Sequence, residues 1–292
     1  MLKKISIVGG AGFLGLNLSK EFYRRGFEIS IYDLKKPQLD FDFNYMKGNV
    51  LNLNKLVTFT KNSNYLINLA GIAEINYSKD NYFETINNNI LGTLNTLEAC
   101  KINGIKNYGF SSTIYVYSKE GSFYKSSKQS AECIIQEFCK TFKINYKILR
   151  YGSLYGKGSQ DWNGIKKYII ETLKSKKIIY HGSGREIRQL IHIDDACKLS
   201  ADIIINKNLK NKSFTITGNQ SFTSNQILSE IFKTVGYKKR VLYKNIKNNL
   251  HYSSTPFTYQ PIKSSIIKPQ KDKKLKHGII EIINEIQGQI KI

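Results

Sequence analysis

The stretch SIVGGAGFLGLNLSKEF, residues 6–22, holds four glycines between an apolar run and an amphipathic run. The apolar run predicts a buried strand, and the amphipathic run predicts a helix that ends at Gly26. Gly9, Gly12 and Gly15 lie between them at the spacing G-x-x-G-x-x-G. Such glycines allow a tight turn, a close approach to a pyrophosphate and close packing on a sheet. By itself the stretch is compatible with a dinucleotide-binding turn or with an ordinary glycine-rich turn.

The next predicted strand, residues 27–33, ends in an acid that favours the first interpretation. Asp33 follows Gly15 by 18 residues, where a carboxylate accepts hydrogen bonds from both ribose hydroxyls. The same carboxylate repels a ribose 2′-phosphate and so favours NAD over NADP, a preference that Lys35 and Lys36 weaken slightly. Strand, glycines, helix, strand and acid together predict a bound dinucleotide, with its phosphates at the helix N-terminus.

Apolar strands alternate with helices through the first half of the chain, which predicts a parallel sheet covered on both faces. We therefore expect an α/β fold with a Rossmann-like, doubly wound parallel sheet in residues 1–155. Residues 156–292 show a looser pattern, which predicts a smaller α+β substrate-binding lobe, and the helix at 193–206 is a candidate to pack back on the first domain. The further strands and helices expected in the first domain lie at 64–71, 81–104, 105–113, 124–143 and 144–150.

Composition limits the class of protein. The chain has 292 residues, and none of its apolar runs approaches the roughly 20 residues needed to span a bilayer. The N-terminal apolar run is short, so we expect no signal peptide. The four cysteines show no C-x-x-C pairing, so we expect buried, reduced thiols, no metal site and a cytoplasmic protein.

The formal charge of +23 comes mostly from lysine, since only six of the 45 basic residues are arginine. The lysines are spread along the chain, and KPQKDKKLKH at 268–277 is the one dense run. Nucleic-acid-binding proteins tend to concentrate basic residues and interleave them with aromatics. We therefore expect a solvated lysine-rich surface, no nucleic-acid partner, and a field that favours a small phosphate-bearing ligand.

The candidate catalytic residues lie where a predicted strand is followed by a helix. Tyr124 and Lys128 are one helical turn apart, so they share a face, and the ammonium favours the phenolate. A tyrosine in this setting can carry the proton of an alcohol while a hydride moves to the cofactor. Ser111, Ser112 and Thr113, at the strand end, can offer a hydroxyl to the substrate oxygen, or they can simply cap a turn.

Taken in order, GGAGFLG, Asp33, NLAG, NNNILGTLNTLEAC, FSSTIYVYS, YKSSK and LRYGSLYG resemble the extended short-chain dehydrogenases/reductases, in their nucleotide-sugar epimerase/dehydratase branch. The resemblance covers residues 1 to about 235. It implies Thr113, Tyr124 and Lys128 as the catalytic set, and Asn89 as a support of the active-site region. The residues that it assigns to the cofactor are Gly9, Gly12, Phe13, Leu14, Gly15, Asp33, Asn49, Val50, Leu69, Ala70, Gly71, Asn89, Ser111 and Tyr151.

The same resemblance extends to the substrate. GREIRQLIHIDDA, residues 184–196, is similar to a family segment whose arginine binds the diphosphate of a nucleotide sugar. This implies Arg188 as a bidentate diphosphate ligand and Ser112 as a further substrate contact. For Arg150 the site and a structural ion pair are equally open. We expect His192 to be a strand-end residue and Asp194 a helix cap.

Family members differ in the chemical step that they perform after oxidation at sugar carbon 4. Dehydratases carry an Asp-Glu pair directly after the active-site threonine, but here these positions are Ile114 and Tyr115, which argues against a 4,6-dehydratase. The absence of cysteine from SSTIYVYS argues weakly against a double epimerase. The prediction is an NAD-dependent nucleotide-sugar 4-epimerase. The alternatives are a 4-dehydrogenase or 4-ketoreductase and, less favoured, a non-catalytic NAD-binding regulator.

Two departures from the family pattern concern the sugar pocket. Only residues 118–123 separate the strand end from Tyr124, where the family usually has a longer segment, and the usual closing pattern after Gly236 is missing. Both departures predict a smaller and more open sugar pocket. The resemblance also implies a homodimer formed through the helices at about 79–103 and 124–142.

Overall fold

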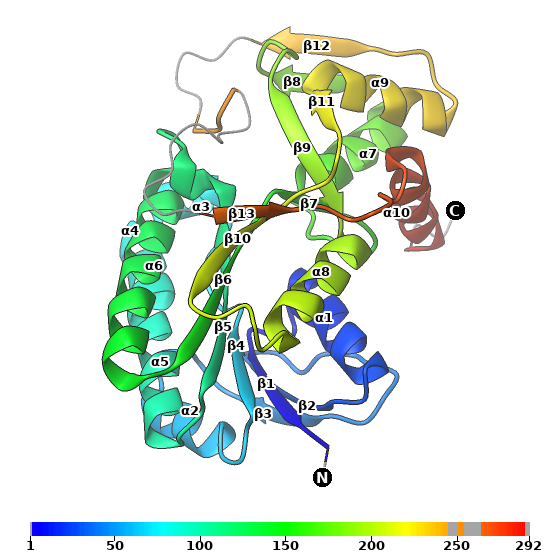
Figure 1. The fold of residues 1–292 in the computed structure, drawn as a ribbon. Helices are drawn as coiled ribbons and strands as arrows, with labels where there is room; N and C mark the ends of the chain where they lie inside the picture. Colours follow the sequence, from blue (N-terminus) through cyan, green and yellow to red (C-terminus); the bar gives the residue numbers. More distant parts are fainter. Residues whose placement is uncertain (1, 245–249, 254–263, 290–292) are drawn as a thin grey trace.

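The computed structural model describes residues 2–244, 250–253 and 264–289, and its central element is an eight-stranded sheet, which can be followed in Figure 1. All of its neighbouring strands pair in parallel. The strand order is β13-β10-β6-β5-β4-β1-β2-β3. The strands are β1 (Lys4–Val8), β2 (Glu28–Asp33), β3 (Asn44–Lys47), β4 (Tyr65–Asn68), β5 (Asn107–Thr113), β6 (Asn145–Tyr151), β10 (Lys212–Ile216) and β13 (Ser264–Ile267).

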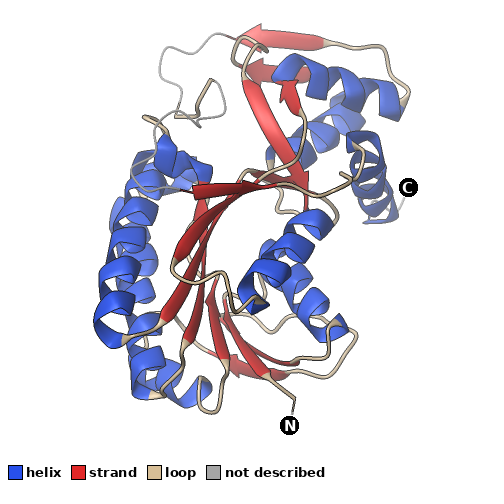
Figure 2. Ribbon diagram, viewed as in Figure 1, coloured by secondary structure: helices blue, strands red, loops and turns tan. Residues whose placement is uncertain are grey.

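Helices cover both faces of the sheet, which explains why its strands are continuous apolar runs (Figure 2). One face carries α1 (Phe13–Arg24) and α8 (Ile193–Ile205). The other carries α2 (Leu53–Phe59), α5 (Gly92–Ile102) and α6 (Ser122–Phe142). The predicted α/β class with a Rossmann-like sheet is confirmed, and α8 does pack back on the first domain, against α1.

The sheet also contains two strands from the part of the chain that was predicted to form the second lobe. β10 pairs with β6, and β13 pairs with β10 on its outer side. In β10 the residues after Lys212 are all buried, as a strand covered on both faces requires. The chain therefore passes between the two lobes more than once, and the division at residue 155 stays a prediction.

The second lobe holds two small sheets, with strand orders β11-β9-β7 and β12-β8. Its helices α7 (Gly164–Ser175), α9 (Ser224–Val235) and α10 (Leu275–Gln289) share an apolar core. The strands are β7 (Ser153–Tyr155), β8 (Ile178–His181), β9 (Ile187–His192), β11 (Ser221–Thr223) and β12 (Val241–Lys244).

The helix predicted for 81–104 is present over residues 82–102, and a π-helical turn at Asn87–Leu91 joins α4 (Tyr82–Ile86) to α5 within it. One local expectation is wrong. The N-cap of α8 is His192 rather than Asp194: its Nδ1 accepts a hydrogen bond from the Asp194 amide, and Asp194 lies in the first turn.

One lysine of the dense run is paired with carboxylates. Lys273 Nζ lies 2.8 Å from Asp194 and 2.9 Å from Glu281, so this lysine ties the C-terminal helix to α8. Three of the four cysteines are buried, but Cys133 is exposed, contrary to expectation. Over the described residues, no helix is long and apolar enough to cross a membrane, and no cluster of potential metal ligands is present.

Candidate active site

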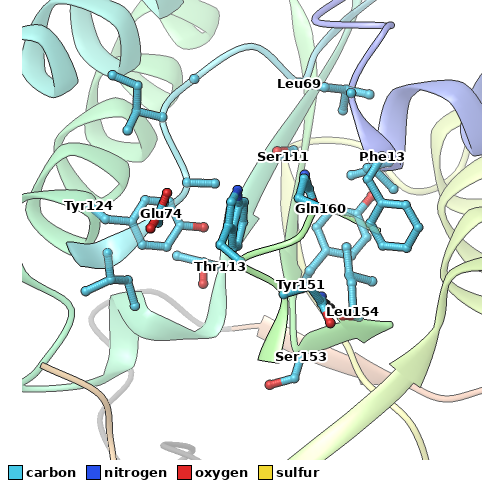
Figure 3. Close-up of a pocket in the computed structure, with 18 of the residues that line it drawn as sticks. Phe13, Leu69, Glu74, Ser111, Thr113, Tyr124, Tyr151, Ser153, Leu154 and Gln160 are labelled. Atoms are coloured by element: carbon cyan, nitrogen blue, oxygen red, sulfur yellow. Dashed lines mark hydrogen bonds between the residues drawn. The ribbon is translucent and has the colours of Figure 1, made fainter. Parts of the chain in front are cut away.

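A cavity of about 850 Å³ lies between the carboxyl ends of the sheet strands and the second lobe. Its lining runs from the glycine turn after β1, past the end of β5, to Arg188 in β9. In Figure 3, Tyr124 and Thr113 lie on one side of this space, and Phe13 and Tyr151 on the other. One continuous cavity therefore joins the residues predicted for the cofactor with those predicted for the substrate.

The glycine turn follows β1, where the strand order reverses: β2 lies on one side of β1 and β4 on the other. Ligands of such sheets usually bind in the crevice at this point. Gly9 has φ +80°, and a Cβ there would lie 2.5 Å from the Ala70 amide nitrogen. A Cβ on Gly15 would lie 2.5 Å from the Gly9 carbonyl oxygen. These two glycines are thus required by the packing of the turn on β4 and on itself.

Gly12 is different, because it has ordinary extended backbone angles and is the N-cap of α1 without a side-chain cap. A Cβ there meets nothing closer than 3.5 Å. The first amides of α1 are therefore left for an anion.

Asp33 holds the turn as well as facing the cavity. Its Oδ2 accepts a hydrogen bond from the Ala11 amide at 2.9 Å, and its Oδ1 accepts one from the Lys35 amide at 3.2 Å. A close-packed glycine turn, an uncapped helix N-terminus and this carboxylate fit the pyrophosphate and ribose of a dinucleotide.

Most of the other predicted cofactor residues line the same cavity. Asn49 does so while its Oδ1 accepts from the Leu51 amide at 2.9 Å. Asn89 lies behind the wall, in the π turn, where its side chain bonds both backbone groups of Ile72 and the Ser127 hydroxyl. The cavity-lining members of the predicted set are Gly9, Gly12, Phe13, Leu14, Gly15, Asp33, Asn49, Val50, Leu69, Ala70, Gly71, Ser111 and Tyr151.

Tyr124 and Thr113 form the polar centre of the cavity wall (Figure 3). Burial raises the pKa of Tyr124 to about 12, and a hydrogen bond with Thr113 offsets part of this rise. The lowering of this pKa that was expected from Lys128 is not found in the protein alone: desolvation of the phenolate is the largest effect, and Thr113 is the group that opposes it.

Lys128 is buried and does not line the cavity. Its Nζ donates to the Ser111 carbonyl oxygen at 2.8 Å and lies 4.6 Å from the centre of the Phe110 ring. Burial lowers the pKa of Lys128 to about 8, against the opposing charge of Glu132. The ammonium is thus held in a fixed place and is easily deprotonated.

Ser112 and Arg150 are part of a buried network. The Ser112 hydroxyl donates to Glu132 Oε1 at 2.5 Å, so the predicted substrate contact is already engaged within the protein. Arg150 is fully buried and forms an ion pair with the same carboxylate. Of the two interpretations of Arg150, the structural ion pair is the one observed.

Arg188 lines the opposite end of the cavity, where its guanidinium lies 4.4 Å from the centre of the Tyr252 ring. The neighbouring His251 Nδ1 is 2.8 Å from the Tyr115 hydroxyl. Burial and the charge of Arg188 lower the pKa of His251, which favours the neutral imidazole. Arg188 therefore presents a positive charge to an aromatic, largely neutral wall.

Sequence reasoning missed several lining residues. His251 and Tyr252 come from a stretch without helical or strand periodicity, so no sequence pattern indicated that they line the cavity. Gln160 and Trp162 follow the LRYGSLYG segment in a glycine-rich loop, and the single tryptophan of the chain was the available signal. The closing segment after Gly236 falls partly on 245–249 and 254–263, outside the described residues.

Residues 5–216 match the NAD dependent epimerase/dehydratase family. The dTDP-D-glucose 4,6-dehydratase of Dictyostelium discoideum is 30% identical over 70% of this chain, but the chain spans only 56% of that protein. A putative UDP-glucose 4-epimerase of Methanocaldococcus jannaschii is 24% identical over 96% of this chain and 97% of its own length. The fold is similar to that of a Bacillus cereus UDP-glucuronic acid 4-epimerase solved with UDP-glucuronic acid and NAD, with TM-score 0.85, 21% identity and coverage of 98% of this chain and 99% of that one. The resemblance read from the sequence is thus confirmed: the chain is an enzyme of the NAD-dependent epimerase/dehydratase family, and its cofactor is NAD.

Proposed function

We propose that this enzyme is a nucleotide-sugar 4-epimerase. The observation that supports it is the single cavity that joins the glycine turn, the Thr113–Tyr124 pair and Arg188. A nucleotide sugar with its diphosphate at Arg188 would extend its sugar toward Tyr124. The likeness to a putative 4-epimerase over nearly the full length of both chains agrees with this proposal.

In the proposed reaction, Tyr124 removes the proton of the hydroxyl on sugar carbon 4 and later returns a proton to the same oxygen. Thr113 donates a hydrogen bond to that oxygen and holds it at Tyr124. Lys128 supplies the positive charge that stabilises the phenolate from behind. NAD, when bound, supplies the hydride acceptor and donor and adds a positive charge that favours the phenolate.

The residues after Thr113 argue against elimination of water. Ile114 is buried in an apolar cluster, and the Tyr115 hydroxyl is engaged with His251. Neither offers a carboxylic acid beside the sugar. This is why we propose epimerisation although one relative is named a 4,6-dehydratase.

A panel of UDP-, dTDP- and GDP-sugars, with products identified by NMR, tests the proposed function. We expect inversion at carbon 4 without added cofactor, because the NAD is regenerated in each turnover. Stoichiometric NADH would indicate the 4-dehydrogenase, and a 4-keto-6-deoxy product would indicate a dehydratase. Either of these products would contradict the 4-epimerase.

Replacing Arg188 by alanine should raise KM for the nucleotide sugar by roughly 10- to 100-fold with a smaller effect on kcat, because a charge-assisted contact to a diphosphate is worth about 1.5–3 kcal/mol. Arg188→Lys should recover only part of this loss, since lysine cannot bind two oxygens in a plane. Arg185→Ala, on an exposed residue three positions earlier, is the control. An unchanged KM in Arg188→Ala would remove this residue from the diphosphate site.

We also propose a homodimer through α4, the π turn, α5 and α6. This surface exposes several large apolar side chains, and the Tyr82 and Phe123 rings are 5.1 Å apart across it. Contiguous exposed apolar surface of this kind marks an interaction site. Phe83, 72% exposed, should be central, so Phe83→Asp should yield a monomer in light scattering, whereas Leu242→Asp, 50% exposed on the other lobe, should not. A wild-type monomer would overturn this proposal.

A further inference from the structure

Three consecutive residues at the end of β5 are tied to one face of α6. The Ser111 carbonyl accepts from Lys128 Nζ at 2.8 Å, and the Ser112 hydroxyl donates to Glu132 at 2.5 Å. Glu132 follows Lys128 by four positions, so both lie on the same face of the helix.

The third strand residue, Thr113, interacts with Tyr124, one turn before Lys128, and this interaction lowers the pKa of Tyr124. The proton-transfer residues thus belong to a ladder of three successive helical turns paired with three successive strand residues. The Glu132 tie is the one that takes no part in the proposed reaction.

Glu132 is held in place by Arg150 on the next strand. Arg150, on β6, donates through Nε to Glu132 Oε1 at 3.0 Å and pairs with Oε2 through Nη2. Its Nη1 donates to the Tyr117 hydroxyl at 2.6 Å, and that hydroxyl lies 3.0 Å from Thr215 Oγ1 on β10. Four elements around the strand end, β5, β6, β10 and α6, therefore meet in one buried polar network.

Stability gives no sufficient reason for this network. Arg150 and Glu132 are 0% and 1% exposed, and taking both charges out of water costs several kcal/mol per ion. A pair of apolar residues of similar volume is often equally stable or more stable. What an apolar pair cannot do is fix the direction of Ser112 and the rotation of α6 through oriented hydrogen bonds.

The network also sets the electrostatic surroundings of Lys128. Glu132 is the charged group that acts on Lys128, and it raises the pKa that burial lowers. The Ser111 carbonyl, the Phe110 ring and the Asn89 amide near Gly71 also lie close to Lys128, and all three are uncharged. Arg150 acts through Glu132, because its charge offsets that of the carboxylate.

We propose that Glu132 and Arg150 are positioning residues, which hold α6 against the end of β5 so that Thr113, Tyr124 and Lys128 keep the alignment that proton transfer needs. This inference rests on the proposed function, because it assigns the network a role in that reaction. Neither residue lines the cavity.

The test compares Glu132→Gln with the double variant Glu132→Leu/Arg150→Leu. Glu132→Gln should fold and retain NAD, but kcat should fall roughly 10- to 100-fold, as expected for a misplaced catalytic group, with KM nearly unchanged. The alkaline limb of the kcat profile should move to lower pH, because removing the carboxylate charge lowers the pKa of Lys128 and the ammonium is lost earlier. The double variant should match the wild type in thermal unfolding and still show low kcat.

Glu21→Gln is the matched control, since Glu21 is another buried carboxylate paired with arginines, on α1. It should leave kcat and the pH profile unchanged. Wild-type kcat in the double variant would overturn the proposal, and so would a loss in Glu132→Gln that results only from reduced stability.

A readout without turnover separates this proposal from the proposed function. NMR of ¹⁵N-labelled lysine should show a group titrating near pH 8 that disappears in Lys128→Arg. In Glu132→Gln that titration should move to lower pH, and in the double variant it should move less. If the wild type converts no nucleotide sugar but this titration shifts, the proposed function fails alone; if activity is present and the titration is unmoved, the positioning proposal fails alone.

Discussion

Replacing Tyr124 by phenylalanine should lower kcat by roughly 10²- to 10⁴-fold, the usual range for loss of a general acid–base group. The substitution removes one hydroxyl and leaves the ring that packs against Tyr115, so NAD content and thermal unfolding should stay near those of the wild type. The measurement is kcat and KM on the converted nucleotide sugar, with bound NAD quantified by mass spectrometry.

Tyr115→Phe is the matched control, because Tyr115 lines the same cavity with its ring centre 6.1 Å from that of Tyr124. Its hydroxyl is paired with His251 rather than Thr113, so its loss should change kcat less than tenfold. Equal losses of kcat in the two variants would show that both hydroxyls contribute alike and that Tyr124 is not a specific proton carrier. Full activity in Tyr124→Phe would contradict the proposed mechanism outright.

The arrangement of the glycine turn and Asp33 was predictable because its signals are local in sequence. A strand, glycines at 9, 12 and 15, a helix and Asp33 fall within 33 residues, and each has a physical reason to be where it is. The alternating apolar runs likewise predicted the parallel sheet, because buried strands and amphipathic helices differ in period.

The rest depends on contacts between distant residues, which periodicity does not encode. Tyr115 meets His251 across 136 positions, and β10 pairs with β6 although residues 152–211 lie between the two strands. The helical spacing of Lys128 and Glu132 was visible, but the partner of Glu132 lies on the next strand. Hence the sequence alone left open whether Arg150 belongs to the site or to a structural ion pair, and the fold was needed to decide.

Substitutions in the glycine turn should also have large effects, and alanine at each of its glycines should impair a different property. Gly9→Ala combines a left-handed backbone with a Cβ 2.5 Å from the Ala70 amide, and should lower the free energy of unfolding by roughly 2–5 kcal/mol. Gly15→Ala should also destabilise the fold, since its Cβ meets the Gly9 carbonyl oxygen at 2.5 Å. Gly12→Ala meets nothing closer than 3.5 Å, so its unfolding free energy should stay within about 0.5 kcal/mol of the wild type.

Gly12→Ala, which should affect the unfolding free energy least, should nevertheless weaken NAD binding. If the helix N-terminus holds the pyrophosphate, an added methyl group there stands between the amides and the phosphates, and Kd for NAD should rise roughly tenfold or more, about 1.4 kcal/mol or above. Urea unfolding and calorimetric titration with NAD measure the two quantities separately. Gly26→Ala, at φ +81° with nothing within 4 Å of the added Cβ, isolates backbone strain, costing about 1–2 kcal/mol with normal NAD affinity. A stable Gly12→Ala protein that binds NAD normally would move the phosphate site away from this turn, because no packing defect could then hide the missing effect.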